Sequence, residues 1–118
     1  MVCDVLVVDD EPAVRDLLRM NLEMDGHRVV AEASDGEQAL EALQAADPDV
    51  VVLDMMMPGT AGDDVLRRMP ARDRERRPWV VAYSASPSHL QVADELGADV
   101  VVLKSGDMEP LLAAVNAA

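Results

Sequence analysis

The chain has 118 residues and a mass of 12.7 kDa, and half of its residues are hydrophobic, so we expect one folded domain over residues 1–118. Its formal net charge of −13 at pH 7 argues against direct binding to nucleic acid, whose phosphates would be repelled, and favours divalent cations or basic protein surfaces. The chain has neither an apolar stretch long enough to span a membrane nor a second cysteine to pair with Cys3, and we therefore expect a cytoplasmic domain without disulfides or membrane contact.

Five apolar runs, most of them rich in valine, alternate with helical patterns along the chain. Continuous apolar runs with many β-branched residues are typical of parallel strands that are covered on both faces. The second run is weaker, and we expect it nearer an edge of the sheet. In chain order, strands are predicted over residues 5–8, 28–33, 50–53, 80–83 and 100–103.

Helices are predicted between these strands, because apolar residues recur there on one helical face. Their expected ranges are residues 11–24, 35–46, 63–69, 88–96 and 108–115. The apolar face of the first helix consists of Val14, Leu17, Leu18 and Leu22. Strand and helix thus alternate five times, which predicts a doubly wound α/β fold around a parallel sheet. Ligands of such folds bind beyond the carboxyl ends of the strands.

Acidic residues follow two of these predicted strands. Asp9 and Asp10 come after the first strand, and Asp54 comes after the third. If the three carboxylates converge, each pair repels by roughly 1–4 kcal/mol, and a cation, a proton or a cationic side chain must relieve the repulsion. Carboxylate oxygens with open positions suit Mg²⁺, so a metal site is predicted here. The alternative is that the three residues are unrelated, exposed helix caps.

The fourth and fifth strands end in different polar groups. Ser84 follows the fourth strand, and Lys104, the only lysine of the chain, follows the fifth. A metal site, a carboxylate nucleophile, a hydroxyl donor and an ammonium group at one rim fit phosphoryl transfer, in which positioning and charge neutralisation do most of the work.

Several motifs carry a resemblance to a known family. They are VLVVDDEP, EASDGEQAL, VVVLDMMMPGTAG, VVAYSAS and LGADVVVLK. With them the chain resembles the receiver domain of two-component response regulators, from about residue 5 to its C-terminal end. Asp54 followed by Met57-Pro58 and then Gly62 is the most specific part of the match. The resemblance implies a flavodoxin-like fold of three α/β/α layers, with five flanking helices and the strand order 2-1-3-4-5.

The resemblance also implies a metal site. Asp10 and Asp54 would hold Mg²⁺ directly, with Mn²⁺ as an alternative ion, and Asp9 would act partly through water. The backbone carbonyl of Met56 would supply a further ligand.

The same resemblance assigns roles in phosphoryl transfer and partners. Asp54 would accept a phosphoryl group from a phosphohistidine of a histidine kinase or phosphotransfer protein, Ser84 would hydrogen-bond a phosphoryl oxygen, and Lys104 would pair with its charge. The implied function is a switch of protein–protein interactions with slow loss of the phosphoryl group, not an enzyme. Implied partners are a downstream output domain or protein, and a second copy bound through the fourth helix, fifth strand and fifth helix.

Two positions depart from the family pattern. Ser105 follows the lysine where the family usually has a cis proline, so we expect a trans peptide bond or a rearranged loop there. Val101 stands where the family usually has Tyr or Phe, and Tyr83 is not expected to replace that aromatic, because neighbours on a strand point to opposite faces. These departures leave open an alternative function, a degenerate receiver that binds proteins independently of phosphorylation.

Three further features have simple interpretations. The arginines between residues 67 and 77 are expected to be solvated, with a docking patch as the alternative. Residues 55–57, three methionines, offer adaptable apolar contact to a partner helix, although Met57 is expected to pack locally before Pro58. His27 and His89 have no partners at metal-binding spacing and are predicted to lie at the surface.

Overall fold

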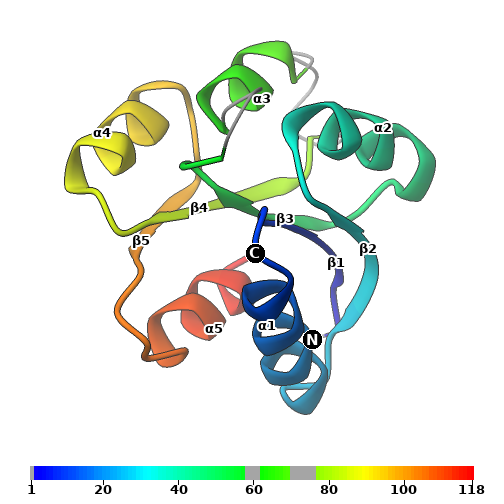
Figure 1. Ribbon diagram of the computed structural model, residues 1–118. Coiled ribbons are helices and arrows are strands. Elements are labelled where there is room, and N and C mark those ends of the chain that lie inside the picture. Colours follow the sequence, from blue (N-terminus) through cyan, green and yellow to red (C-terminus); the bar gives the residue numbers. More distant parts are fainter. Residues whose placement is uncertain (1, 58–61, 70–76) are drawn as a thin grey trace.

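The computed structural model describes residues 2–57, 62–69 and 77–118. Within these residues, five parallel strands form one sheet in the order β2-β1-β3-β4-β5, and five helices cover its two faces (Figure 1). The strands are β1 (Asp4–Val8), β2 (Arg28–Ala33), β3 (Val50–Asp54), β4 (Trp79–Ser84) and β5 (Val100–Leu103). The helices are α1 (Pro12–Met24), α2 (Gly36–Ala46), α3 (Gly62–Arg68), α4 (Pro87–Glu95) and α5 (Glu109–Asn116). The predicted fold class, strand order and edge position of β2 are confirmed.

The core has two halves, one on each face of the sheet. In Figure 1, α1 and α5 lie on one face of the sheet and α2, α3 and α4 on the other. Side chains alternate between the faces along a strand, so Val5 and Val7 of β1 pack towards α1 and α5, while Leu6 and Val8 pack towards α2, α3 and α4. These four residues and all of Val50–Leu53 have no solvent exposure. The central strands are therefore covered on both faces, as their continuous apolar runs predict.

Two expectations about burial are wrong. Val101 and Leu103 of β5 are 37% and 50% exposed, while Val102 between them is buried. Because β5 is the last strand of the sheet, the helices cover it fully on one face only. Leu17 of α1 is 44% exposed, since Leu18 and Leu22 occupy the side of the helix that faces the sheet.

A polar network around the buried His27 links distant parts of the chain at the amino ends of the strands. The Nδ1 atom of His27 accepts the backbone N–H of Cys3 at 3.1 Å, so in the neutral ring the proton lies on Nε2, which is 2.9 Å from Oδ1 of Asn116. The Asn116 amide in turn donates to Asp25 at 2.8 Å. The expected surface position of His27 is therefore wrong, since the residue is only 4% exposed; His89 is exposed, as predicted.

The helices are short. The longest helix of the described residues, α1, has 13 residues, whereas a membrane span needs roughly 20 apolar residues. None of the helices in the described parts of the chain is long and apolar enough to cross a membrane.

Candidate functional site

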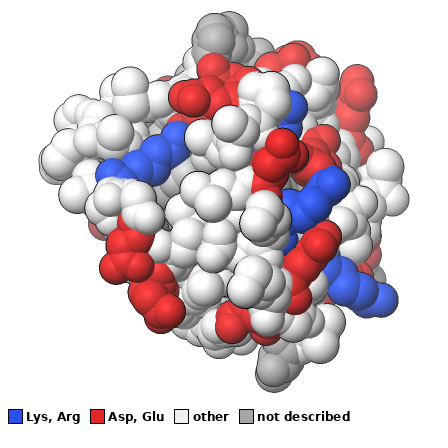
Figure 2. Space-filling view, turned by 60° about the horizontal axis from the view of Figure 1, so that its bottom comes forward, with Lys and Arg blue, Asp and Glu red and all other residues white. Residues whose placement is uncertain are grey.

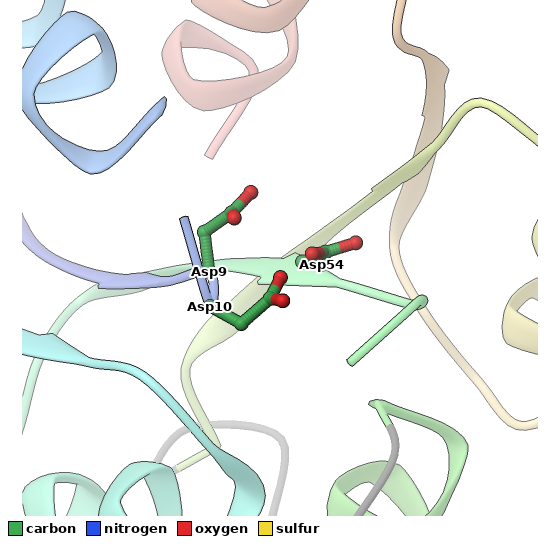
Figure 3. A group of neighbouring side chains, drawn as sticks. All are labelled: Asp9, Asp10 and Asp54. Atoms are coloured by element: carbon green, nitrogen blue, oxygen red, sulfur yellow. The ribbon is translucent and has the colours of Figure 1, made fainter. Parts of the chain in front are cut away.

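Three carboxylates meet at the carboxyl ends of β1 and β3. Asp9 and Asp10 follow β1, and Asp54 is the last residue of β3, the strand paired with β1 through Val8 and Leu53. One carboxylate oxygen from each acid lies within 4.8 Å of the other two (Figure 3). The predicted convergence is found. The alternative of three unrelated, exposed caps is wrong, because Asp9 and Asp54 are 0% and 1% exposed.

Both carboxylate oxygens of Asp9 accept hydrogen bonds. Oδ1 accepts the backbone N–H of Glu11 at 2.9 Å, which turns the chain from β1 into α1. Oδ2 accepts the hydroxyl of Tyr83 and the ammonium of Lys104, the latter at 3.2 Å. A buried carboxylate is stable only with such donors, and Asp9 obtains them from three separate parts of the chain.

The contacts of the Asp54 carboxylate among the described residues are all made by one oxygen, Oδ1. Oδ1 accepts the backbone N–H of Met56 at 2.9 Å and lies 3.4 Å from the ammonium of Lys104. Burial raises the pKa of Asp54 from 3.8 to about 6, and the negative charge of Asp9 adds to the rise, whereas the Met56 N–H and Lys104 oppose it. Desolvation therefore dominates, and the group is an ionised, poorly hydrated carboxylate at neutral pH.

Lys104 lies between the acids, as its place after β5 predicts. Its backbone N–H donates to the carbonyl of Ser84 at 2.9 Å, which continues the pairing of β4 with β5 by one residue. Its ammonium contacts Asp9, Asp54 and the ring of Tyr83, whose centroid is 4.5 Å away. No cis peptide bond occurs in the described ranges, so the bond between Lys104 and Ser105 is trans, as expected.

Ser84 lies at the same rim of the sheet. It is the last residue of β4, it is fully buried, and its Oγ accepts the backbone N–H of Ser86 at 3.0 Å. The hydroxyl keeps its own proton for a further acceptor.

The segment after β3 is also part of the site. Met55 and Met57 are 2% and 7% exposed, whereas Met56 is 48% exposed, so of the three methionines only Met56 is open to a partner. A Cβ atom on Gly62 would lie 2.5 Å from the carbonyl oxygen of Asp54 and 2.9 Å from Cα of Met55. Only glycine permits this close approach of α3 to the end of β3. Pro58, also part of the motif, lies outside the described residues.

Tyr83 is the site residue that the sequence analysis did not predict. It points away from the face that carries its neighbours and packs on the α1 and α5 side, as the alternation of a strand requires. Its side chain is long enough to bring the hydroxyl to Asp9 at the rim. Burial, and then the hydrogen bond to Asp9, raise its pKa far above the usual value. The usable signal was a lone tyrosine at a strand end in a chain without phenylalanine.

The described arginines of the segment 67–77 lie away from the three acids. Arg67 pairs with Asp63 at 2.8 Å, Arg68 pairs with Glu37 at 2.6 Å, and Arg77 donates to the carbonyl of Gly97 at 2.7 Å. These contacts fit arginines that balance the chain's own acids. On the face of the molecule shown in Figure 2, basic side chains also lie next to acidic ones. The remaining arginines, Arg72, Arg74 and Arg76, lie outside the described residues, so the docking-patch alternative stays a prediction.

Comparison with known proteins identifies similar chains. A family model described as the response regulator receiver domain matches residues 5–116. The nitrate/nitrite response regulator protein NarP of Escherichia coli (strain K12) is 37% identical over 114 residues, which are 96% of this chain and 53% of NarP. The chain thus spans about half the length of this curated relative.

Solved structures agree with this result. The signal receiver domain of NarL from Mycobacterium tuberculosis is 35% identical, with a TM-score of 0.85 over 98% of this chain and 94% of that one. The response regulator protein TrrA from Thermotoga maritima, in complex with Mg²⁺-BeF, is 30% identical, with a TM-score of 0.84 over 97% of this chain and 96% of that one.

Proposed function

This chain belongs to the response regulator receiver family, and on that premise we propose that Asp54 accepts a phosphoryl group in a Mg²⁺-dependent step that switches protein–protein interactions. The observation that carries the proposal is the convergence of Asp9, Asp10 and Asp54, together with Lys104 at 3.4 Å from Asp54. Converging acids of which two, Asp9 and Asp54, are buried are suited to a cation, and an ammonium beside Asp54 is suited to a transferred anion.

The donor atoms of this cluster fit a magnesium ion. Carboxylate oxygens are hard ligands, and two or three of them with water complete the octahedral shell that Mg²⁺ prefers. Asp10 and Asp54 would hold the ion directly, Asp9 would act partly through water, and the backbone carbonyl of Met56 would supply another oxygen. The same oxygen set also accepts Mn²⁺. The complex of TrrA with Mg²⁺-BeF supports this assignment for a similar chain.

The proposed chemical step is an in-line displacement at phosphorus. An oxygen of Asp54 attacks the phosphorus of a phosphohistidine, a new P–O bond forms, and the P–N bond breaks. The electron pair of the broken bond returns to the imidazole, which takes a proton from solvent. Among the described residues no hydrogen bond to Oδ2 of Asp54 is present, so this oxygen is free to act as the nucleophile.

Two side chains then act on the transferred group. Lys104 exchanges its contact with Asp54 for one with the phosphoryl oxygens, and Ser84 donates its hydroxyl to another of them. Mg²⁺ held by the carboxylates of Asp10 and Asp54 would supply positive charge to the phosphoryl oxygens during the transfer. The chain is proposed to act as a phosphoacceptor that loses the group slowly, not as an enzyme with turnover.

The proposed partners follow from the family. A histidine kinase or phosphotransfer protein would supply the phosphoryl group, and an output domain or protein would respond to it. A second copy could bind through α4, β5 and α5, where Val101 and Leu103 are exposed.

The test is the intact mass of the protein after incubation with Mg²⁺ and acetyl phosphate. We expect one phosphoryl adduct on the wild type and on Asp94→Asn, which removes an exposed carboxylate of α4, and none on Asp54→Asn. The adduct should disappear when EDTA replaces Mg²⁺. A wild type that binds Mg²⁺ but gains no mass would contradict the proposal and favour the phosphorylation-independent binding module.

A further inference from the structure

Tyr83 contacts both groups that flank Asp54 in this site. Its hydroxyl donates to Oδ2 of Asp9, and its ring lies beneath the ammonium of Lys104 at 4.5 Å. Tyr83 itself is only 4% exposed, and its ring packs in the core between the sheet and the helices α1 and α5.

The tyrosine is the best-anchored donor to Oδ2 of Asp9. Lys104, the other donor to that oxygen, has a long flexible stem, and its side chain is 26% exposed. The Tyr83 ring has only two rotatable bonds and is surrounded by core residues, so the position of its hydroxyl is set by packing. A fixed donor orients a carboxylate, because rotation of the carboxylate would break the hydrogen bond.

The aromatic ring of Tyr83 makes a second contact, with the ammonium of Lys104, that does not depend on the hydroxyl. An ammonium within about 6 Å of an aromatic centroid is attracted by the negative face of the ring. The ring of Tyr83 therefore attracts the ammonium of Lys104, which also contacts Asp9 and Asp54 at 3.2 and 3.4 Å.

We infer that Tyr83 is a positioning residue of the phosphoryl-transfer site, which orients Asp9 towards Mg²⁺ through its hydroxyl and holds Lys104 beside Asp54 through its ring. This inference rests on the proposed function for its chemical context, but the orientation of Asp9 can be measured without any phosphoryl transfer. Substitution of a residue that orients a metal ligand typically weakens metal binding by 10- to 100-fold.

The first test is the affinity for Mg²⁺, measured by calorimetric titration of Tyr83→Phe. This change removes the hydroxyl and keeps the ring. We expect the dissociation constant to rise about tenfold. The matched control is Trp79→Phe, which removes another hydrogen bond of the same strand, from the indole N–H to the carbonyl of Ala114 at 3.0 Å, far from the acids. Its dissociation constant should stay within twofold of the wild-type value.

A double-mutant cycle separates positioning from a general loss of stability. In an Asp9→Asn background the carboxylate that Tyr83 orients is gone, so Tyr83→Phe should change the Mg²⁺ dissociation constant by less than about twofold. A purely structural role would lower the melting temperature in EDTA in both backgrounds and leave the Mg²⁺ affinity of the folded protein unchanged. Unchanged or tighter Mg²⁺ binding by Tyr83→Phe would overturn the inference.

The ring is tested by phosphoryl transfer from acetyl phosphate at saturating Mg²⁺. Tyr83→Leu should react about threefold more slowly than Tyr83→Phe, because only the leucine variant lacks the aromatic support of Lys104. Equal rates would refute the role of the ring. If the wild type binds Mg²⁺ but takes no phosphoryl group, the proposed function fails, while weaker Mg²⁺ binding by Tyr83→Phe still supports the orienting role of the hydroxyl.

Discussion

Asp54→Asn should stabilise the metal-free protein, because the native carboxylate is an unfavourable charge in the folded state. Burial raises the pKa of Asp54 from 3.8 to about 6. As the pH rises, the unfolded chain releases this proton first, while the folded chain keeps it up to about pH 6. The ionisation therefore removes stability between about pH 4 and pH 6, and the full penalty is present above that range.

The size of the effect follows from the shift in pKa. Each tenfold change in an ionisation constant is worth about 1.4 kcal/mol, so the penalty amounts to about 3 kcal/mol at about pH 7.5 and about 1 kcal/mol at about pH 4.5. Asparagine has nearly the same shape and carries no charge. The variant should therefore gain up to about 3 kcal/mol in free energy of unfolding at the higher pH and about 1 kcal/mol at the lower pH.

The assay is urea unfolding in EDTA at these two pH values, followed by the fluorescence of Trp79, the only tryptophan. Asp94→Asn serves as the control for removing one exposed negative charge, and its free energy of unfolding should match the wild type. Adding Mg²⁺ at a hundred times its dissociation constant should stabilise the wild type by about 2.7 kcal/mol and Asp54→Asn much less. If Asp54→Asn shows the same pH dependence as the wild type, desolvation of this carboxylate is not the dominant effect, and the reasoning is refuted.

Three further changes have expected outcomes. Gly62→Ala should lower the free energy of unfolding by about 2–4 kcal/mol and weaken Mg²⁺ binding, since its Cβ would meet the backbone of Asp54 at 2.5 Å; an alanine variant with wild-type melting temperature and Mg²⁺ affinity would contradict this. His27→Ala should lower the free energy of unfolding by about 2–4 kcal/mol, because it leaves the Cys3 N–H without its acceptor and opens a cavity. The Mg²⁺ affinity of this variant should equal that of the wild type, because His27 lies at the opposite end of the sheet from the three acids. A loss of Mg²⁺ affinity would argue against that separation. Met56→Asn should lose the phosphoryl group faster than the wild type, since an exposed apolar side chain beside Asp54 hinders the attacking water; the decay of the mass adduct measures this, and an equal or slower decay counts against it.

Much of the fold and of the site could be predicted from local patterns. The valine-rich runs predict strands that are covered on both faces, and β1, β3 and β4 are buried in this way. The carboxyl ends of parallel strands lie at one rim of a sheet. For this reason the residues that follow the apolar runs are enough to predict that Asp9, Asp54, Ser84 and Lys104 lie together at that rim.

Other features depend on distances that no local pattern contains. The alternation of a strand predicts the face on which Tyr83 lies, but not that its side chain reaches the end of a neighbouring strand. His27 is buried because its ring meets Cys3 and Asn116, which are 24 and 89 residues away in the chain. The half-open face of β5 depends on how far the helices extend over the last strand.

The sequence by itself determined the order of elements and the chemistry at the strand ends, because both follow from hydrophobic periodicity and from residue types beside each apolar run. Only the tertiary structure decided which donors hold Asp9, how strongly burial shifts the pKa of Asp54, and where the ammonium of Lys104 lies. These properties depend on contacts between segments far apart in the chain and on exclusion of water, and both arise only when the sheet and its helices have packed together.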